Sequence, residues 1–391
     1  MASENIQALK SYVIEIRRVL HRRPELSFQE FETAKIIEAE LRNMGLEPVR
    51  MAETGVVACI RGSLPGKTVA VRADMDGLPV TEENKVEYAS RNPGVMHACG
   101  HDAHMAMLLG LAKLLYSNRN KLRGTVKLLF QPAEESPPGG AKKLIEEGAI
   151  DGVDYIIGQH VMSKIPAGKI AVFDRVAMAN TDSFKIEISG KGGHGSAPHE
   201  TVDVLLLGAE IVLLAQKIIS RRVDPSKTAV LTFGTFNAGY RHNIIAAHAI
   251  LTGTVRTFEE ETRKLIENEL EKIVSQVCDS SGVEHRLEYI RGYDAVVNDP
   301  GVTKIVENSA KKILGDDSVL RPPPDTGGED FGEYLKRVPG SFYFFGVGNV
   351  DKKITSPQHS PTYNIDEDSL IDGVKILYES VLGLLSEEGR V

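Results

Sequence analysis

The segment TVAVRADMD, residues 68–76, is a run of mostly apolar residues that ends in two aspartates. Two later segments, TVKLLFQ (125–131) and DYIIGQH (154–160), have the same form, an apolar run that ends in polar residues. Between the first two lies AHMAMLLGLAKLLY (103–116), whose length and apolar spacing are those of a helix. Short apolar strands that alternate with helices predict an α/β domain with a mainly parallel sheet and helices on both faces.

The pattern changes after residue 180, where strands and helices follow one another in a different order. The segments that we predict are strand 183–189, helix 202–222, strands 228–236 and 247–258, helix 259–277 and strand 284–290. This βαββαβ order is that of a ferredoxin-like domain. We therefore expect an inserted domain, residues 181–290, within one α/β domain made of residues 1–180 and 291–391.

Length, charge and cysteine content limit the classes of function. The 391 residues are too many for one ordinary core, which agrees with two domains. The formal net charge of -8 argues against a nucleic-acid partner, because no basic surplus exists to displace counterions from phosphates. The apolar stretch VLLLGAEIVLLA, from Val204, contains Glu210 and is shorter than the ~18–20 residues that cross a membrane. With three scattered cysteines and an N-terminal segment typical of an amphipathic helix, we expect a cytoplasmic protein.

Residues with metal-binding side chains gather at the ends of the predicted strands and at the start of helix 103–116. In open α/β sheets the ligand crevice lies at the carboxyl ends of the strands, so these side chains should meet. The set that we select consists of Cys99, His101, Glu135, His160 and His359. Any one of them alone is better explained by core packing. Together, a thiolate, imidazoles and a carboxylate suit zinc, manganese, cobalt or nickel better than magnesium or calcium.

Glu134 and Glu135 form the next informative pair. Neighbouring carboxylates are usually part of a solvated surface, but these two follow a buried strand and Pro132. Two adjacent acids allow one to bind a metal while the other acts as general base on the attacking water. The pair therefore favours a metal-dependent hydrolase, with Glu134 as the catalytic residue.

Several short segments, taken in order, resemble one known family. They are RADMDGLPV (72–80), HACGHDAH (97–104), FQPAEE (130–135), GKGGHGSAPH (190–199), HNII (242–245) with GTVRTF (253–258), GGEDF (327–331) and SPQHSPTY (356–363). The chain resembles the aminoacylase, hippurate hydrolase and auxin-conjugate amidohydrolase family of dinuclear metallopeptidases. This group includes thermostable archaeal carboxypeptidases. The likeness is collinear over nearly the whole chain.

The resemblance implies that the five selected ligands bind two divalent metal ions, with zinc expected first. It also implies that Glu134 is the general base. The inserted domain matches the family's lid, which also forms the dimer contact, so a homodimer or a dimer-based oligomer is expected. His194 matches a histidine that reaches the active site of the partner subunit and stabilises the oxyanion. Asn243 and Arg256 match groups that hold the carbonyl and the free carboxylate of a small peptide or N-acyl amino acid.

Two segments depart from the family's pattern. Ser136-Pro137-Pro138 follows the glutamate pair where glycine is more usual, and Ala246 occupies the place of a common proline. Neither change removes a ligand. They leave the local loop shape and the substrate preference open.

Three alternatives remain at this stage. A cysteine hydrolase would use Cys99 as nucleophile, but it would not need a glutamate pair and a distant histidine. A protein that only binds metal or amino acids would not need Glu134. A serine hydrolase is not among these alternatives, because the sequence contains no Gly-x-Ser-x-Gly segment. Within the enzyme interpretation, a carboxypeptidase and an N-acyl-amino-acid deacylase both cut an amide next to a carboxylate, so the residues do not separate them.

Overall fold

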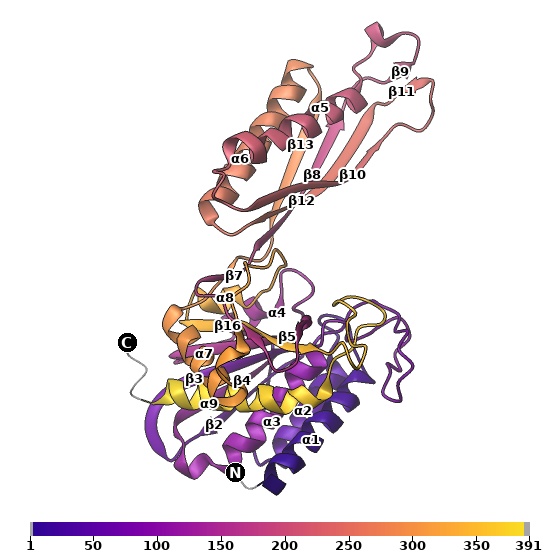
Figure 1. The fold of residues 1–391 in the computed structure, drawn as a ribbon. Coiled ribbons are helices and arrows are strands. Elements are labelled where there is room, and N and C mark those ends of the chain that lie inside the picture. Colours follow the sequence, from indigo (N-terminus) through magenta and orange to yellow (C-terminus); the bar gives the residue numbers. More distant parts are fainter. Residues whose placement is uncertain (1–2, 387–391) are drawn as a thin grey trace. The chain divides into compact units, whose positions relative to one another are not determined.

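The computed structural model describes residues 3–386 and divides the chain into two compact units (Figure 1). The first unit comprises the chain up to Ala177, Val296–Pro324 and the chain from Glu329 onward. The second unit comprises Met178–Ala295 and the short segment Asp325–Gly328. Each unit has its own hydrophobic core.

The first unit is built on an eight-stranded sheet. In spatial order its strands are β1 (Val49–Met51), β2 (Gly55–Arg61), β4 (Arg123–Gln131), β3 (Leu64–Asp74), β5 (Tyr155–Pro166), β16 (Gly340–Gly348), β6 (Ile170–Ala171) and β15 (Val319–Leu320). The four central strands, β4, β3, β5 and β16, are parallel to one another. At one edge β1, β2 and β4 pair in antiparallel fashion, and β6 is antiparallel to β16. The predicted α/β class is confirmed.

The antiparallel strands β1 and β2 were not predicted. The first four residues of β2 are all buried, and exposed positions appear only at Cys59 and Arg61. A short apolar run of this kind has no period that distinguishes a strand from part of a buried helix. The sequence signal was therefore strongest for the longer central strands, which carry the site.

Helices pack against both faces of this sheet. The helices that share one core with alternate residues of the strands are α1 (Ser3–His21), α2 (Phe31–Asn43), α3 (His101–Ser117), α7 (Pro300–Leu314) and α9 (Leu370–Leu385). On the other face, α8 (Gly332–Leu335) packs against α4 (Gly140–Glu146), and the ring of Phe331 lies against that of Phe342 of β16, with centroids 5.1 Å apart. Helix α3 is buried almost all round. Among the described residues, none of the helices combines the length and the hydropathy that a membrane crossing requires.

The second unit has a four-stranded antiparallel sheet in the order β10-β12-β8-β13. Its elements are β8 (Asn180–Ser189), α5 (Val204–Lys217), β10 (Ala229–Ala238), β12 (His248–Thr257), α6 (Glu260–Ser280) and β13 (Glu284–Arg291). Their order along the chain is βαββαβ. Leucine, isoleucine and valine side chains of α5 and α6 form one core with the sheet. Two short ribbons complete the structure, β9 (Gly193–His194) with β11 (Ile244–Ile245), and β7 (Val176–Met178) with β14 (Val296–Val297).

Candidate metal centre

Cys99 and His101 are positioned by the turn that begins α3. Gly100 between them has φ +88°, in the left-handed region that favours glycine. A Cβ at this position would lie 2.3 Å from Val161 Cγ2 and 2.7 Å from Tyr363 Oη, so a larger residue would displace the turn. Both flanking side chains are buried, Cys99 at 8% and His101 at 0% exposure. The turn thus holds a thiol and an imidazole inside the first unit.

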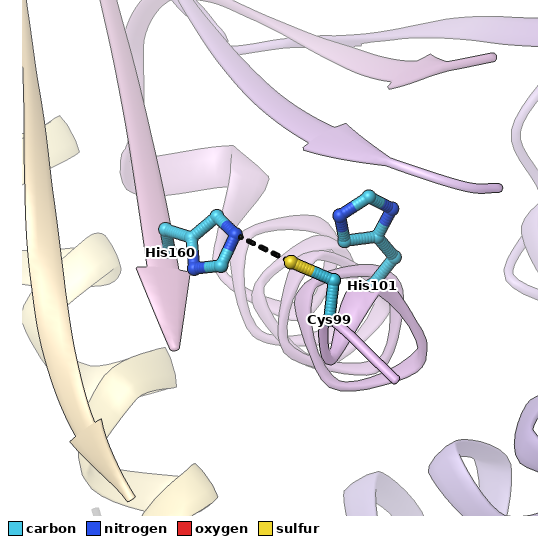
Figure 2. Close-up of side chains that lie close together, drawn as sticks. All are labelled: Cys99, His101 and His160. Carbon is cyan, nitrogen blue, oxygen red and sulfur yellow. Dashed lines mark hydrogen bonds between the residues drawn. The ribbon is translucent and has the colours of Figure 1, made fainter. Parts of the chain in front are cut away.

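His160 of β5 completes a first group, in which the ligand atoms of Cys99, His101 and His160 lie within 4.8 Å of one another. Cys99 Sγ is 3.3 Å from His160 Nε2, and a dashed line marks this contact in Figure 2. The other ring nitrogen, Nδ1, is 2.8 Å from the carbonyl oxygen of Val161. Because a carbonyl only accepts, Nδ1 carries the proton and Nε2 presents a lone pair to the cluster. Burial and the neighbouring His104 lower the pKa of His160 well below its usual range, which keeps the ring neutral.

A second group of ligand atoms, also within 4.8 Å of one another, comes from Cys99, Glu135 and His359. His359 Nε2 lies 3.2 Å from Glu135 Oε1. The backbone of His359 has φ +64°, which is uncommon for a residue other than glycine, and its N–H donates to Ala98 O at 2.8 Å. Such backbone conformations are often found at functional sites. Because Cys99 belongs to both groups, the five side chains form one continuous cluster.

Asp76 orients two members of this cluster. Its Oδ1 is 3.1 Å from His101 Nδ1, while its Oδ2 accepts from the backbone N–H of Glu135 at 3.0 Å and from Ser27 Oγ at 2.7 Å. The opposite ring nitrogen, His101 Nε2, is buried and has no hydrogen-bond partner among residues 3–386. Burial disfavours the charged ring, but Asp74 and Asp76 outweigh it and raise the pKa of His101 to about 10. A carboxylate behind one nitrogen and an unshared opposite nitrogen are typical of a metal-binding histidine.

His104, in the same segment of sequence, has other partners. Its Nδ1 lies 2.5 Å from Asp74 Oδ1, and its Nε2 accepts a hydrogen bond from the Val161 N–H at 2.8 Å. Both ring nitrogens are therefore engaged. His104 links Asp74, at the end of β3, to Val161, in the middle of β5, and with both ring nitrogens engaged we do not select it as a ligand.

Glu134 and Glu135 reach the cluster from the turn after β4. His101 Nε2 lies 4.0 Å from Glu134 Oε2 and 3.9 Å from Glu135 Oε1. The preceding residue, Ala133, has φ +51° and donates its N–H to Glu30 Oε1 at 2.8 Å. The two adjacent carboxylates thus enter the same space side by side.

Arg72 is the centre of a buried ion-pair network beside Glu134. Its guanidinium nitrogens lie 2.8 Å from Asp74 Oδ2, 2.9 Å from Glu329 Oε1 and 3.0 Å from Asp330 Oδ1. Oxygens of Glu134, Glu329 and Asp330 lie within 4.8 Å of one another. Burial, and then the negative charge of Glu329, raise the pKa of Glu134 well above its usual range. The surroundings therefore increase the affinity of Glu134 for a proton.

The remaining predicted residues belong to the second unit, where two of them are neighbours. His194 of β9 pairs with Ile244 of β11, and the Gly195 N–H donates to Asn243 O at 2.9 Å. Both His194 and Asn243 are exposed. The short ribbon thus presents an imidazole and an amide together.

Arg256 lies at the opposite end of this unit. In the antiparallel pairing of β12 with β8, His248 is opposite Ser189 at one end and Arg256 is opposite Thr181 near the other. The ribbon that carries His194 is connected to the sheet at the end where His248 lies, because β9 follows β8 and β11 precedes β12 in the chain. From His248 to Arg256 a strand extends about 26 Å, at ~3.3 Å per residue. Arg256 is half-buried, and its guanidinium donates to the carbonyl oxygen of Val255 at 3.0 Å.

The sequence analysis assigned no role to several charged residues that the structure places at the site. They are Arg72, Asp74, Asp76, Glu329 and Asp330. All five lie within the segments RADMD and GGEDF, which we had singled out, so a signal was present. The sequence did not show which of these side chains form ion pairs, because partners such as Arg72 and Glu329 are 257 positions apart.

The model of peptidase family M20/M25/M40 matches residues 70–383 of this chain. The chain belongs to this family. It is therefore a hydrolytic enzyme, and the family resemblance inferred from the motifs is confirmed.

Similar proteins carry related names. Thermostable carboxypeptidase 2 of Saccharolobus solfataricus is 42% identical over 371 residues, which cover 94% of this chain and 93% of that protein. An N-acyl-L-amino acid amidohydrolase of Geobacillus stearothermophilus is 46% identical over 303 residues, covering 76% and 82%. Among solved structures, a dinuclear metal-binding peptidase of Bacillus subtilis is similar with a TM-score of 0.85 and 32% identity, covering 97% of this chain and 99% of that one.

Proposed function

We propose that this chain hydrolyses an amide bond next to a free carboxylate in a metal-dependent reaction. The residues that would hold two divalent transition-metal ions are Cys99, His101, Glu135, His160 and His359. The observation that carries the proposal is their single cluster, with Glu134 at its edge. One thiolate, three imidazoles and a carboxylate suit zinc best, with manganese, cobalt and nickel as alternatives. Such ions supply charge that polarises a carbonyl and lowers the pKa of water.

Glu134 is the proposed general base. Its carboxylate would take a proton from the attacking water and return it to the leaving amine, which is the usual pair of roles for one carboxylate in amide hydrolysis. Arg72 balances the surrounding acids and keeps them in place.

We propose a homodimer formed through the second unit, which would also act as a lid. Three leucines of α5 support this proposal, because Leu205, Leu206 and Leu213 are 49%, 63% and 70% exposed. Strand β10 lies at the edge of its sheet, where unpaired backbone groups favour pairing with another strand. An exposed leucine face beside an open strand edge is the surface that a second copy of this chain would cover.

The distance between Arg256 and the ribbon of His194 within the second unit supports the proposal that each active site uses residues from both subunits of a dimer. Arg256 would hold the substrate carboxylate, while His194 and Asn243 would contact the carbonyl. The two places are separated by about the 26 Å that eight strand residues span, whereas a dipeptide with a blocking group spans at most ~11 Å. This distance supports the proposal that one substrate does not contact Arg256 and His194 of the same subunit. If Arg256 serves its own site, His194 and Asn243 serve the partner's.

The proposed substrates are N-blocked dipeptides, short peptides or N-acyl amino acids. The two similar proteins named above are called a carboxypeptidase and an N-acyl-L-amino acid amidohydrolase. Both names describe cleavage beside a free carboxylate, and Arg256 supplies the cation for it. We propose a cytoplasmic location, since an exposed free Cys59 and a ligand thiolate at Cys99 suit a reducing compartment. The net charge of -8 speaks against a nucleic-acid substrate.

A cysteine hydrolase is the alternative with a specific observation in its favour, the 3.3 Å approach of Cys99 Sγ to His160 Nε2. The electrostatics oppose it. Burial, and then Glu135 and Glu134, raise the pKa of the Cys99 thiol well above its usual range. A nucleophilic cysteine needs the reverse, a low pKa maintained by positive neighbours. The same acids around a thiol suit a site that is completed by cations.

Metal removal tests the proposal directly. Chelated protein should lose activity on a panel of N-blocked dipeptides and N-acetyl or N-benzoyl amino acids, and zinc, cobalt or manganese should restore it. Metal analysis should give about two ions per subunit, the number used in two-metal hydrolases. Full activity of metal-free protein, or loss of activity by thiol alkylation that added metal does not protect against, would support the cysteine mechanism instead.

A further inference from the structure

Glu30 is a buried carboxylate that the proposed mechanism does not use. Its side chain is 0% exposed, although glutamate is rarely buried without a partner. Oε1 accepts hydrogen bonds from the N–H of Ala133 at 2.8 Å and from the N–H of Phe28 at 3.0 Å. Oε2 accepts a hydrogen bond from Thr54 Oγ at 2.6 Å. All three contacts lie within the first unit.

The two backbone donors share an uncommon conformation. Ala133 has φ +51° and Phe28 has φ +61°, both in the left-handed region that residues with a side chain rarely adopt. Each of these residues therefore needs a contact that compensates for its backbone strain. One oxygen of Glu30 provides that contact for both.

Ala133 is also the residue directly before Glu134. On the other side of Glu134, the N–H of Glu135 donates to Asp76 Oδ2 at 3.0 Å. The carboxylate of Glu134 is thus carried by a turn that is held at both ends by buried acids. Asp76 also contacts His101, whereas the side-chain hydrogen bonds of Glu30 within residues 3–386 go to Phe28, Thr54 and Ala133, none of which belongs to the metal cluster.

Helix α2 explains why Glu30 is available for this contact. Glu30 is the residue before the first turn of α2, a position whose side chain usually accepts from the helix's own N–H groups. Glu25 takes over that function, accepting from the N–H of Glu32 at 3.1 Å and of Thr33 at 2.8 Å. The side chain of Glu30 is then free to reach Ala133, 103 positions further along the chain.

We propose that Glu30 is a positioning residue for the general base, which acts by holding Ala133 in its left-handed conformation and so directing the Glu134 carboxylate. This inference rests on the proposed role of Glu134. It predicts that the loss of Glu30 affects turnover and leaves metal binding and substrate affinity in place. Burial raises the pKa of Glu30 to about 7, so the neutral form is accessible, and a neutral side chain of the same shape should serve as well.

Three variants test the proposal. Glu30→Ala removes the acceptor, and kcat should fall on the order of 10–100-fold with little change in KM or metal content, as expected for a small misplacement of a catalytic group. Glu30→Gln keeps an oxygen for both N–H groups and an amide for Thr54, so it should retain most of kcat. Thr54→Val is the matched control. It removes a buried hydrogen bond to the same side chain without touching Ala133, so it should lower Tm and leave kcat unchanged.

Hydrogen–deuterium exchange provides a readout that does not depend on activity. The peptide that covers residues 131–136 should exchange faster in Glu30→Ala than in wild type, Glu30→Gln or Thr54→Val. Equal kcat in Glu30→Ala and wild type at equal metal content, or equal losses in Glu30→Ala and Thr54→Val, would overturn the proposal. If Glu30→Ala does not fold, a large loss of kcat in folded Glu30→Gln overturns it. A wild-type protein that cleaves no substrate of the panel would refute the proposed function, while the exchange result would still show whether Glu30 holds the turn.

Discussion

The two units hold their candidate functional residues in opposite ways. In the first unit Cys99, His101 and His160 are buried, and their surroundings fix which atom each presents to the cluster. In the second unit His194 and Asn243 are exposed on a two-stranded ribbon. With the roles proposed above, the metal chemistry would be assembled inside the first unit, and His194 and Asn243 would contact substrate from an exposed part of the second unit. Substitutions in the two units should therefore differ in their effects on metal content, turnover and substrate preference.

The largest effect is expected at Glu134, at the edge of the metal cluster. Glu134→Gln keeps the size of the side chain but removes its ability to take a proton. We expect turnover to fall on the order of 10²–10⁴-fold, the usual contribution of a general acid–base group, with metal content unchanged. Steady-state kinetics and metal analysis of the purified variant measure both quantities.

Glu135→Gln is the matched control, since it makes the same chemical change one residue further on. Its carboxylate lies 3.2 Å from His359 and belongs to the ligand group with Cys99, so this variant should lose metal. Loss of metal in Glu134→Gln, with full metal content in Glu135→Gln, would show that the two roles are reversed.

The same comparison shows what the sequence can predict. Central strands and helix α3 have apolar runs long enough to be recognised, and the residues at their ends could be expected to meet because parallel strands share a carboxyl edge. Cys99, His101 and His160 came together on this argument alone. The partners behind them did not follow from it, because an ion pair such as Arg72 with Glu329 depends on tertiary contacts that no local pattern records.

The second unit illustrates the other limit. His194, Asn243 and Arg256 were selected by resemblance to a family, and each alone has the pattern of an ordinary surface residue. That Arg256 lies at the far end of β12 from the ribbon of His194 follows from strand register, which was not predicted. The sequence motifs identified His194, Asn243 and Arg256, but the distance of Arg256 from the other two follows only from the pairing of β12 with β8.

The second largest effect is expected at His194. A donor placed where negative charge develops contributes a few kcal/mol in acyl transfer, so His194→Ala should lose on the order of 10²–10³ in kcat. Metal content should not change, because His194 belongs to a different unit from the cluster. Kinetics and metal analysis on the same sample test both statements.

Complementation shows whether His194 acts on the partner's site. His194→Ala subunits are mixed with Glu134→Gln subunits and allowed to exchange. If His194 acts in trans, each mixed dimer has one site with both defects and one site with neither. Random exchange then restores about a quarter of wild-type activity, because half the dimers are mixed and half their sites are intact. A mixture that stays inactive after verified exchange means that His194 serves its own subunit.

Arg256 should show an effect that depends on the substrate. A guanidinium can pair with a carboxylate through two parallel hydrogen bonds, and such charged contacts contribute about 1.5–3 kcal/mol. We expect Arg256→Ala to lower kcat/KM on free-acid substrates roughly 10–100-fold more than on the corresponding amides. Arg256→Lys should recover only part of this difference, since it keeps the charge and loses the fork. Equal losses on acids and amides would assign Arg256 a structural role.

An effect on metal affinity, with turnover of the metal-loaded enzyme little changed, is expected at Asp76, which lies behind the cluster in the first unit. Both of its oxygens accept hydrogen bonds, Oδ1 from His101 and Oδ2 from Glu135 and Ser27. Asparagine has one accepting oxygen, so in Asp76→Asn an N–H group must face either the His101 ring or the Glu135 amide. Replacing such a partner of a metal-binding histidine typically lowers metal affinity by about 10–100-fold.

Ser27→Ala is the matched control for this change. It removes one donor to Asp76 Oδ2 and leaves the carboxylate with both oxygens able to accept, so metal affinity should stay close to that of wild type. Competition with a chelator of known affinity measures the difference between the two variants. If Asp76→Asn binds metal as tightly as Ser27→Ala, the cluster does not depend on the groups behind it. The contrast between a preassembled first unit and an exposed second unit would then rest on burial alone.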